Sequence, residues 1–405
     1  MYNTILEKQI ISKILIFILV GGCLWSGAYK YADEIIQATA GNVYITDAVT
    51  PSYEETSKEF LDALPFKQIM VDFNGLVAKT LNMREIYQNS GGVVGSNGYV
   101  VGIYPQTSID YELQQTLALK NFLDERGIQL LYVNEPTKYF DDTFIQKDLG
   151  KKTYVNSNID LFLSSLEDVG IDYIDLRSTY ARMGLDSFSL FYKTDHHWTV
   201  PAGKIAAQEI AATLNENFGY KIDLDLYEDE NFTTTHFDNA WLGEQGRKLS
   251  ASFVGMDDYD LILPKYDTDF TVTYRDGNTY SGTFGEVLVS QGVYVSKANN
   301  DIYNAPSWHY SYMSGGVTES IVLNNTNPDK KKILVLGDSF EQVTVPFLSL
   351  GVSEIQTLIL RSYEGSLRDY IDAHDIDTVI IAYVSSMIVE NDKEASANYT
   401  IFDFE

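Results

Sequence analysis

The sequence Lys-Ile-Leu-Val-Leu-Gly-Asp-Ser-Phe at residues 332–340 predicts a buried strand that ends in a tight turn. Its apolar run is nearly continuous, which is typical of a strand covered on both faces. Gly337 permits a close turn, and Asp and Ser are common in turns. We therefore expect Ser339 to be exposed at the carboxyl end of the strand, where backbone N–H groups can stabilise an oxyanion.

An alternation of helices and strands extends outward from this segment. Upstream, helices are expected at 111–126, 159–169 and 201–218, with strands at 128–133 and 171–176. Downstream, strands are expected at 354–360 and 378–384, with a helix at 366–374 between them. Apolar strands joined by helices predict an α/β fold with a doubly wound, mostly parallel sheet. Reactive groups in such sheets lie at the carboxyl ends of the strands.

The alternation breaks between residues 225 and 330, where aromatic, β-like sequence includes a hairpin at 270–274 and 279–284. We therefore divide the chain into five parts. These are a membrane segment (1–30), a stalk with a leading helix (31–95), the first part of the α/β domain (96–224), a β-rich insertion (225–330) and the second part of the α/β domain (331–405).

The amino-terminal segment is expected to anchor the chain in the cell membrane. Lys8 and Lys13 precede a run of 16 residues, 14–29, that carries no charge. Positive charge before such a run keeps the amino terminus cytoplasmic, so everything from Tyr31 onward should lie outside the cytoplasm. A lipoprotein site at Cys23, a cleaved signal and a buried core helix are the alternatives.

The bulk composition limits the partners. The 405 residues carry a formal net charge of -28, which disfavours nucleic acid and other polyanions as ligands, although solubility alone also explains such a charge. With one cysteine, the chain can form neither an intrachain disulfide nor a cysteine metal cluster.

A second segment, Asp195-His196-His197-Trp198-Thr199, supplies the groups that a serine nucleophile needs. Histidine is the usual base near neutral pH, and a carboxylate fixes its tautomer. Asp195 can do this for His197 within one loop. Capping or core-packed histidines are an alternative reading. A metal site of Asp195, His196 and His197, supplemented by His236 or His309, is another.

These two segments, in this order, resemble the DHHW proteins and the related alginate O-acetylation proteins of the AlgX and AlgJ type. The resemblance covers roughly residues 90–220 and 330–390 and implies an SGNH-hydrolase-like, flavodoxin-like fold. It also implies a triad of Ser339, His197 and Asp195, in a chain order permuted relative to ordinary SGNH hydrolases. His196 becomes a dispensable spacer, and the catalytic Asn of ordinary SGNH hydrolases has no assignable counterpart here.

Further residues are expected to contact substrate. Arg361 and Tyr363 resemble an Arg-aromatic pair near the site of this family, although a surface salt bridge would also explain Arg361. Lys138 follows a strand at the same sheet edge, and Trp198 adjoins His197. The loop at 241–247 can border the cleft with its backbone. The aromatic cluster at 308–310 suits either sugar stacking or core packing.

The resemblance implies an extracytoplasmic O-acyltransferase, in particular an O-acetyltransferase, that acts on a polysaccharide. It also implies a membrane-bound O-acyltransferase partner that delivers the acyl group, and it requires no metal or organic cofactor. A carbohydrate esterase with the same triad is the first alternative. A non-catalytic polysaccharide-binding scaffold that keeps the fold is the second.

Overall fold

The computed structural model describes residues 67–84, 92–290, 302–303, 307–313, 318–327, 329–388 and 399–405. The chain divides into two units, one formed by residues 1–88 and 248–255 and the other by the remainder. In the first unit, helix α3 (Lys67–Thr80) packs on the short helix α10 (Ala251–Val254). The second unit contains the two segments expected to be catalytic, 195–199 and 332–340.

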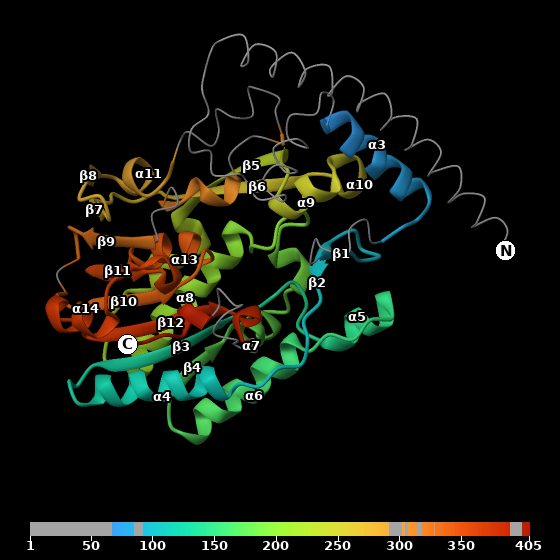
Figure 1. Cartoon of the computed structure of the whole chain (residues 1–405). Helices are drawn as coiled ribbons and strands as arrows, with labels where there is room; N and C mark the ends of the chain where they lie inside the picture. Colours follow the sequence, from blue (N-terminus) through green and yellow to red (C-terminus); the bar gives the residue numbers. More distant parts are fainter. Residues whose placement is uncertain are drawn as a thin grey trace, which may run out of the picture. The chain divides into compact units, whose positions relative to one another are not determined.

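The second unit is built on a mixed sheet, which has eight strands among the residues described. Figure 1 shows it running from β4 and β3 at one end to β7 and β8 at the other. In spatial order the strands are β4 (Asp172–Asp175), β3 (Gln129–Glu135), β12 (Thr378–Val384), β10 (Lys332–Gly337), β11 (Glu354–Leu358), β9 (Glu319–Asn324), β7 (Phe270–Tyr274) and β8 (Thr279–Gly282). The strands from β4 to β11 are parallel, and β9, β7 and β8 continue the sheet antiparallel.

The order of the parallel strands is flavodoxin-like once the chain is permuted. Counted from β10, the strands β10, β11, β12, β3 and β4 lie in the spatial order 2-1-3-4-5, which is that of flavodoxin-like sheets. The switch point of such a sheet therefore lies between β10 and β12, and ligands bind outside the carboxyl ends of the strands at that point.

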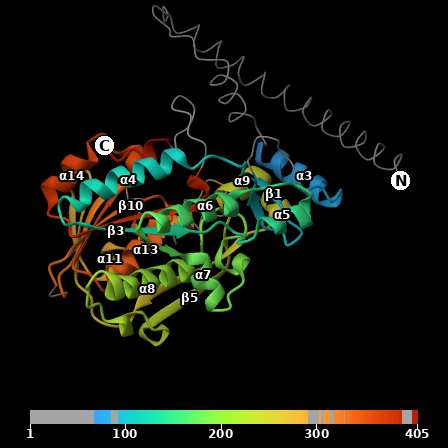
Figure 2. The same ribbon diagram turned by 90° about the horizontal axis from the view of Figure 1, so that it is seen from below.

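Helices cover both faces of the parallel strands because successive strand side chains alternate between two cores. Leu131, Val335 and Ile380 face one core, together with helices α8 (Val200–Asn217) and α13 (Glu341–Leu348). Tyr132 and Leu336 face the other, together with α4 (Asp110–Asp124), α6 (Val155–Asp168) and α14 (Leu367–His374). Figure 2 shows α4 and α14 on one side of the strands and α8 on the other.

The segment 225–330, which we expected to be an insertion, contributes to the main sheet. The predicted hairpin is present as β7 and β8, and β7 pairs with β9, which pairs with β11. The rest includes a separate two-stranded ribbon of β5 (Phe232–Trp241) and β6 (Asp257–Pro264). Side chains of β7 and β9, such as Phe270 and Val322, are buried in the main core. These strands therefore extend the main sheet and do not form a separate inserted domain.

Among the described residues, the remaining helices and strands are short. They are β1 (Gly92–Val94), β2 (Val100–Gly102), α5 (Asp142–Leu149), α7 (Leu176–Arg182), α9 (Glu244–Leu249), α11 (Phe284–Val287) and the 3-10 helices η1 (Ser187–Leu190), η2 (Leu224–Tyr227), η3 (Asp229–Asn231), η5 (Trp308–Ser311), η7 (Leu360–Ser362), η8 (Ser385–Met387) and η9 (Tyr399–Ile401).

The expected membrane anchor at residues 1–30 lies outside the described residues. Within the part of the chain that is described, each helix is too short or too polar to cross a bilayer.

Candidate active site

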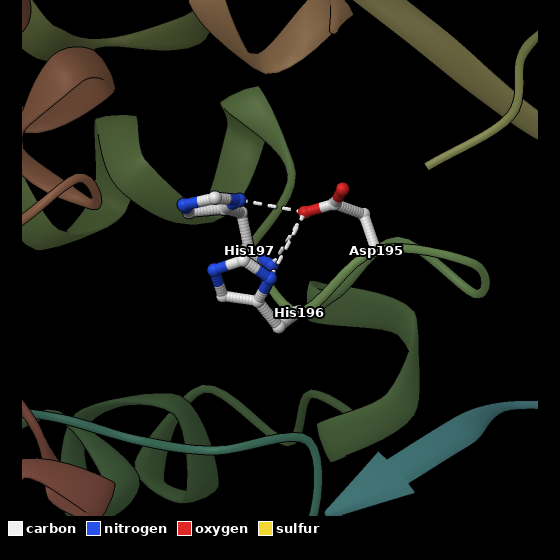
Figure 3. A group of neighbouring side chains, drawn as sticks. All are labelled: Asp195, His196 and His197. Carbon is white, nitrogen blue, oxygen red and sulfur yellow. Dashed lines mark hydrogen bonds and ion pairs between the residues drawn. The ribbon is translucent and has the colours of Figure 1, made fainter. Parts of the chain in front are cut away.

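Three side chains from two distant segments form a continuous hydrogen-bonded chain at the carboxyl end of β10. The Ser339 hydroxyl oxygen lies 2.6 Å from His197 Nε2, and His197 Nδ1 lies 2.6 Å from Asp195 Oδ1. Figure 3 shows the His197 ring directed at the Asp195 carboxylate. A carboxylate can only accept, so Nδ1 donates, and Nε2 is left to accept the hydroxyl proton of Ser339. This is the arrangement that activates a serine.

Backbone N–H groups and His197 hold Asp195 in its ionised form. Asp195 Oδ1 also accepts from the backbone N–H of His197 at 3.1 Å, and Oδ2 accepts from that of Glu244 at 2.8 Å. Burial alone would raise the pKa of Asp195, but the charge and hydrogen bond of His197 outweigh it. The pKa of this carboxyl therefore lies well below its usual range.

A second buried carboxylate fixes the loop that carries Asp195. Asp257, on β6, accepts hydrogen bonds from the backbone N–H groups of Lys193 and Thr194 and from the Thr194 hydroxyl. Asp257 was not expected from the sequence. Asp257 is one of three aspartates between residues 257 and 260, and nothing in the local sequence indicates that its partner lies 63 residues upstream.

The loop at 241–247, which was expected to border the cleft, supports the same segment from another side. The N–H of Gly243 donates to the Thr194 hydroxyl at 2.7 Å, and the N–H of Gly246 donates to the Thr194 carbonyl at 2.8 Å. A Cβ on Gly243 would lie 2.4 Å from the Asp195 Cβ and 2.5 Å from the Thr194 carbonyl oxygen. Glycine is therefore required for this close approach.

The turn that carries Ser339 is held by the preceding residue, Asp338. One oxygen of Asp338 accepts from the Phe340 N–H at 2.9 Å, and the other accepts from the Val384 N–H at 3.0 Å. Asp338 thus ties the nucleophile turn to the end of β12. Burial raises the pKa of this carboxyl.

A cavity of about 240 Å³ opens at Ser339, at the switch point between β10 and β12. Its walls come from loops after several parallel strands. The lining includes Tyr104, His196, Gln245, Ser339, Arg361 and Ser386. The position of this cavity agrees with the prediction that chemistry occurs at the carboxyl ends of the strands.

The expected substrate contacts fall into two groups. Arg361, on η7, is exposed and lines the cavity, so a ligand can reach its guanidinium. Lys138 also lines the cavity, but its ammonium already donates to the carbonyls of Val100 at 2.7 Å and Lys193 at 3.2 Å and to the Gln245 side chain at 3.2 Å. Lys138 therefore joins three segments around the site, which leaves its donors occupied.

Trp198 and Tyr363 lie elsewhere. Trp198 is fully buried, packs edge-to-face on Phe340 and donates its indole N–H to the Phe340 carbonyl at 3.3 Å. Trp198 precedes the N-cap of α8, and its side chain lies in the core and outside the lining of the cavity, which corrects the expectation that it contacts substrate. Tyr363 packs edge-to-face on Tyr370 and lies outside the lining of the cavity.

The adjacent histidine, His196, lies on the cavity wall. Its Nδ1 is 3.7 Å from Asp195 Oδ1, which is too long for a hydrogen bond. Desolvation, followed by the neighbouring His197, lowers the pKa of His196 to about 4. The metal-binding alternative used the same three residues, which do offer ligand atoms within 4.8 Å of one another. Both ring nitrogens of His197 are already hydrogen-bonded, which favours acid–base chemistry over metal binding.

A third histidine, His309, completes the site. The sequence placed it in an aromatic cluster and offered it as a supplementary ligand for the metal-site alternative. Its ring stacks on that of His197, with centroids 3.4 Å apart and planes inclined by 13°. Its Nε2 lies 2.6 Å from the carbonyl oxygen of Ser339.

Part of the chain is similar to a known protein family. Residues 105–250 match the family model described as the SGNH hydrolase-like domain of the acetyltransferase AlgX. This part of the chain resembles an AlgX-type SGNH hydrolase-like domain. Asp195 and His197 lie inside the matched range, and the resemblance predicted from the two sequence segments is confirmed.

Solved structures share the fold of this SGNH-like domain. PatB1 of Bacillus cereus, determined with a sulfonyl adduct, has a TM-score of 0.60 at 21% identity, covering 76% of this chain and 98% of PatB1. A DHHW family protein from Eubacterium siraeum has a TM-score of 0.56 at 16% identity. The alignment covers 77% of this chain and 96% of the DHHW protein. At these identities the likeness shows the fold alone. A search of curated proteins gave no match.

Proposed function

We propose that the protein is an extracytoplasmic O-acyltransferase, specifically an O-acetyltransferase, that acylates hydroxyl groups of a polysaccharide. The observation that carries this proposal is the hydrogen-bonded chain from Ser339 through His197 to Asp195 at the edge of a cavity. The match to an acetyltransferase family supports acyl transfer as the reaction class.

In the first half of the reaction, the Ser339 hydroxyl oxygen attacks the carbonyl carbon of the acyl donor while its proton passes to His197 Nε2. Asp195 stabilises the imidazolium that forms, because its carboxylate accepts from Nδ1. The tetrahedral intermediate then expels the leaving group, which takes the proton from His197 and leaves an acyl-serine. The Ser339 backbone N–H is our candidate for stabilising the oxyanion.

In the second half, a sugar hydroxyl gives its proton to His197 and attacks the acyl-serine carbonyl. Collapse of this intermediate transfers the acyl group to the sugar and returns the proton to Ser339. Arg361 is suited to bind the donor or the acceptor, because its guanidinium is exposed at the cavity. Each step is a proton and acyl transfer, so the residues on the site suffice for it.

The supply of acyl groups sets the location of the protein in this proposal. A membrane-bound O-acyltransferase partner would deliver the acyl group to the outer face of the membrane. The apolar segment 14–29 would tether the catalytic unit there. The net charge of -28 disfavours a polyanionic acceptor at long range, so a neutral or cationic glycan suits the surface best.

The test is acyl transfer from an aryl acetate, with and without oligosaccharide acceptors, followed by mass analysis of the glycan. We expect an acetyl-serine at Ser339 and an acetylated oligosaccharide. Ser339→Ala should abolish both, whereas Ser165→Ala, on the outer helix α6, should leave both unchanged. Hydrolysis that no glycan alters would identify an esterase instead. Full activity of Ser339→Ala would end the enzyme proposal and favour a binding protein.

A further inference from the structure

His309 occupies an unusual position for a residue outside the hydrogen-bonded chain. It lies on η5 in the segment 307–313, and only 1% of its surface is exposed. Two separate contacts join it to the reacting groups. Its ring stacks on His197 at 3.4 Å, and its Nε2 reaches the Ser339 carbonyl oxygen at 2.6 Å. One side chain therefore touches both the base and the backbone of the nucleophile.

These contacts determine the tautomer of His309. The Ser339 carbonyl oxygen can only accept, so Nε2 carries the hydrogen. Nδ1 is buried without a hydrogen-bond partner among the described residues. Placing a second proton on Nδ1 would put an unpaired charge in the interior, which is costly. The ring is therefore neutral, with one fixed donor.

The surroundings reinforce the neutral form. The titratable groups that face His309 are His197, His196 and Asp195. Burial and then the charge of His197 lower the pKa of His309 well below its usual range, and they outweigh Asp195 and the Ser339 carbonyl, which act in the opposite direction. Both histidines beside His197 thus have lowered pKa values.

We propose that His309 is a positioning residue for the acyl transfer proposed above: its neutral ring fixes the plane of His197, and its Nε2–H holds the peptide of Ser339. Both effects fix the hydrogen bond between the Ser339 hydroxyl and His197 Nε2. Displacing either group by about 1 Å costs about a hundredfold in rate. The ring has a second effect once His197 has taken the proton. The face of a neutral aromatic ring attracts a cation, whereas a charged neighbour would repel it.

Two substitutions separate the two contacts of His309. His309→Gln keeps an N–H donor at about the reach of Nε2 and removes the ring. His309→Phe keeps a stacking ring and removes the donor, which leaves the Ser339 carbonyl without this partner. His236→Gln is the matched control, because His236 is exposed and hydrogen-bonded to Asp260, away from the reacting groups.

The first measurement is the rate constant for inactivation of the full-length chain by phenylmethylsulfonyl fluoride, together with kcat and KM for an aryl acetate. Variants are compared with wild type after thermal unfolding shows that they fold. We expect each His309 variant to lose at least about tenfold in the inactivation rate and in kcat. KM should be unchanged, because His309 does not line the cavity. The control should match wild type.

The second measurement needs no substitution. In nitrogen-15 spectra of the wild-type histidines, His309 should show the Nε2–H tautomer and should not titrate between about pH 5 and 8. An Nδ1–H tautomer, titration in that range, or His309 variants that react at the wild-type rate would overturn the inference. A wild-type protein that neither reacts with the sulfonyl fluoride nor hydrolyses the ester would instead overturn the proposed function.

Discussion

Replacing Asp195 by asparagine exchanges one carboxylate oxygen for an NH₂ group. The hydrogen bonds that the two oxygens accept predict how far the reaction rate falls. Asp195 Oδ1 accepts from the backbone N–H and the Nδ1–H of His197, and Oδ2 accepts from the N–H of Glu244. Asparagine offers one oxygen and one NH₂ group, so one side of the buried amide must face another donor. The two orientations have different costs.

If the NH₂ group faces Glu244, a buried donor loses its acceptor and the bond to His197 loses its charge. This costs about 1.5–3 kcal/mol, or about ten- to a hundredfold in rate. If the NH₂ group faces His197, Nδ1 becomes an acceptor and the ring proton moves to Nε2. Nε2 then cannot take the Ser339 proton, and a wrong tautomer of this kind costs about 10⁴-fold. We expect kcat to fall by about 10 to 10⁴, depending on which orientation the amide adopts.

The assay is the initial rate of 4-nitrophenyl acetate hydrolysis, analysed for kcat and KM, with the Tm measured in parallel. Asp260→Asn is the control, because Asp260 pairs with His236 Nδ1 at 2.7 Å on the exposed ribbon of β5 and β6. It should behave like wild type. If Asp195→Asn kept kcat within about threefold of wild type, catalysis by His197 would not depend on this carboxylate.

Three further outcomes follow from the same contacts. Gly243→Ala should lower kcat at least about tenfold, because the new Cβ would lie 2.4 Å from the Asp195 Cβ; an unchanged kcat would contradict this packing. His196→Gln should keep kcat within about threefold, since its ring makes no hydrogen bond to Asp195 at 3.7 Å, and a loss of about a hundredfold in the same assay would show that it takes part in the reaction. Burial raises the pKa of Glu135 well above its usual range and that of Glu341 to about 7, so the folded state favours their protonated forms. The stability that protonated Glu341 contributes is complete below its unfolded pKa and is lost as pH rises through its folded pKa of about 7. The Tm should therefore fall as pH rises from about 5 through 7, and the fall should be smaller in Glu135→Gln; a flat wild-type profile would contradict this.

The sequence predicted those parts of the fold that depend on local pattern. Continuous apolar runs identified β10 and β12 with their bounds, because strands buried on both faces need apolar side chains at every position. The spacing from Asp195 to His197 within one loop, and the position of Ser339 after a strand, predicted residues that the fold brings together.

Other features depend on contacts that no local pattern encodes. Asp257 and His309 reach the site from the segment 225–330, and no local motif distinguishes either from the polar and aromatic residues around it. Trp198 was assigned to substrate because it adjoins His197. The backbone alternates there, and consecutive side chains point in different directions, so Trp198 enters the core. Lys138 was expected to contact substrate. It lines the cavity, but three acceptors around its ammonium fix it in place.

The permuted strand order also affects the nascent chain. On the ribosome, β3 and β4 are made well before β10, and β12 is the last of the parallel strands to emerge, yet it pairs with β3 on one side and β10 on the other. Until residue 384 has been synthesised, one edge of the β3–β4 pair is unpaired. Ser339 then has no fixed position relative to His197. Such long-range pairing is slow to form. For the reaction proposed above, the nascent chain is therefore inactive until β12, the last of its parallel strands, has been inserted.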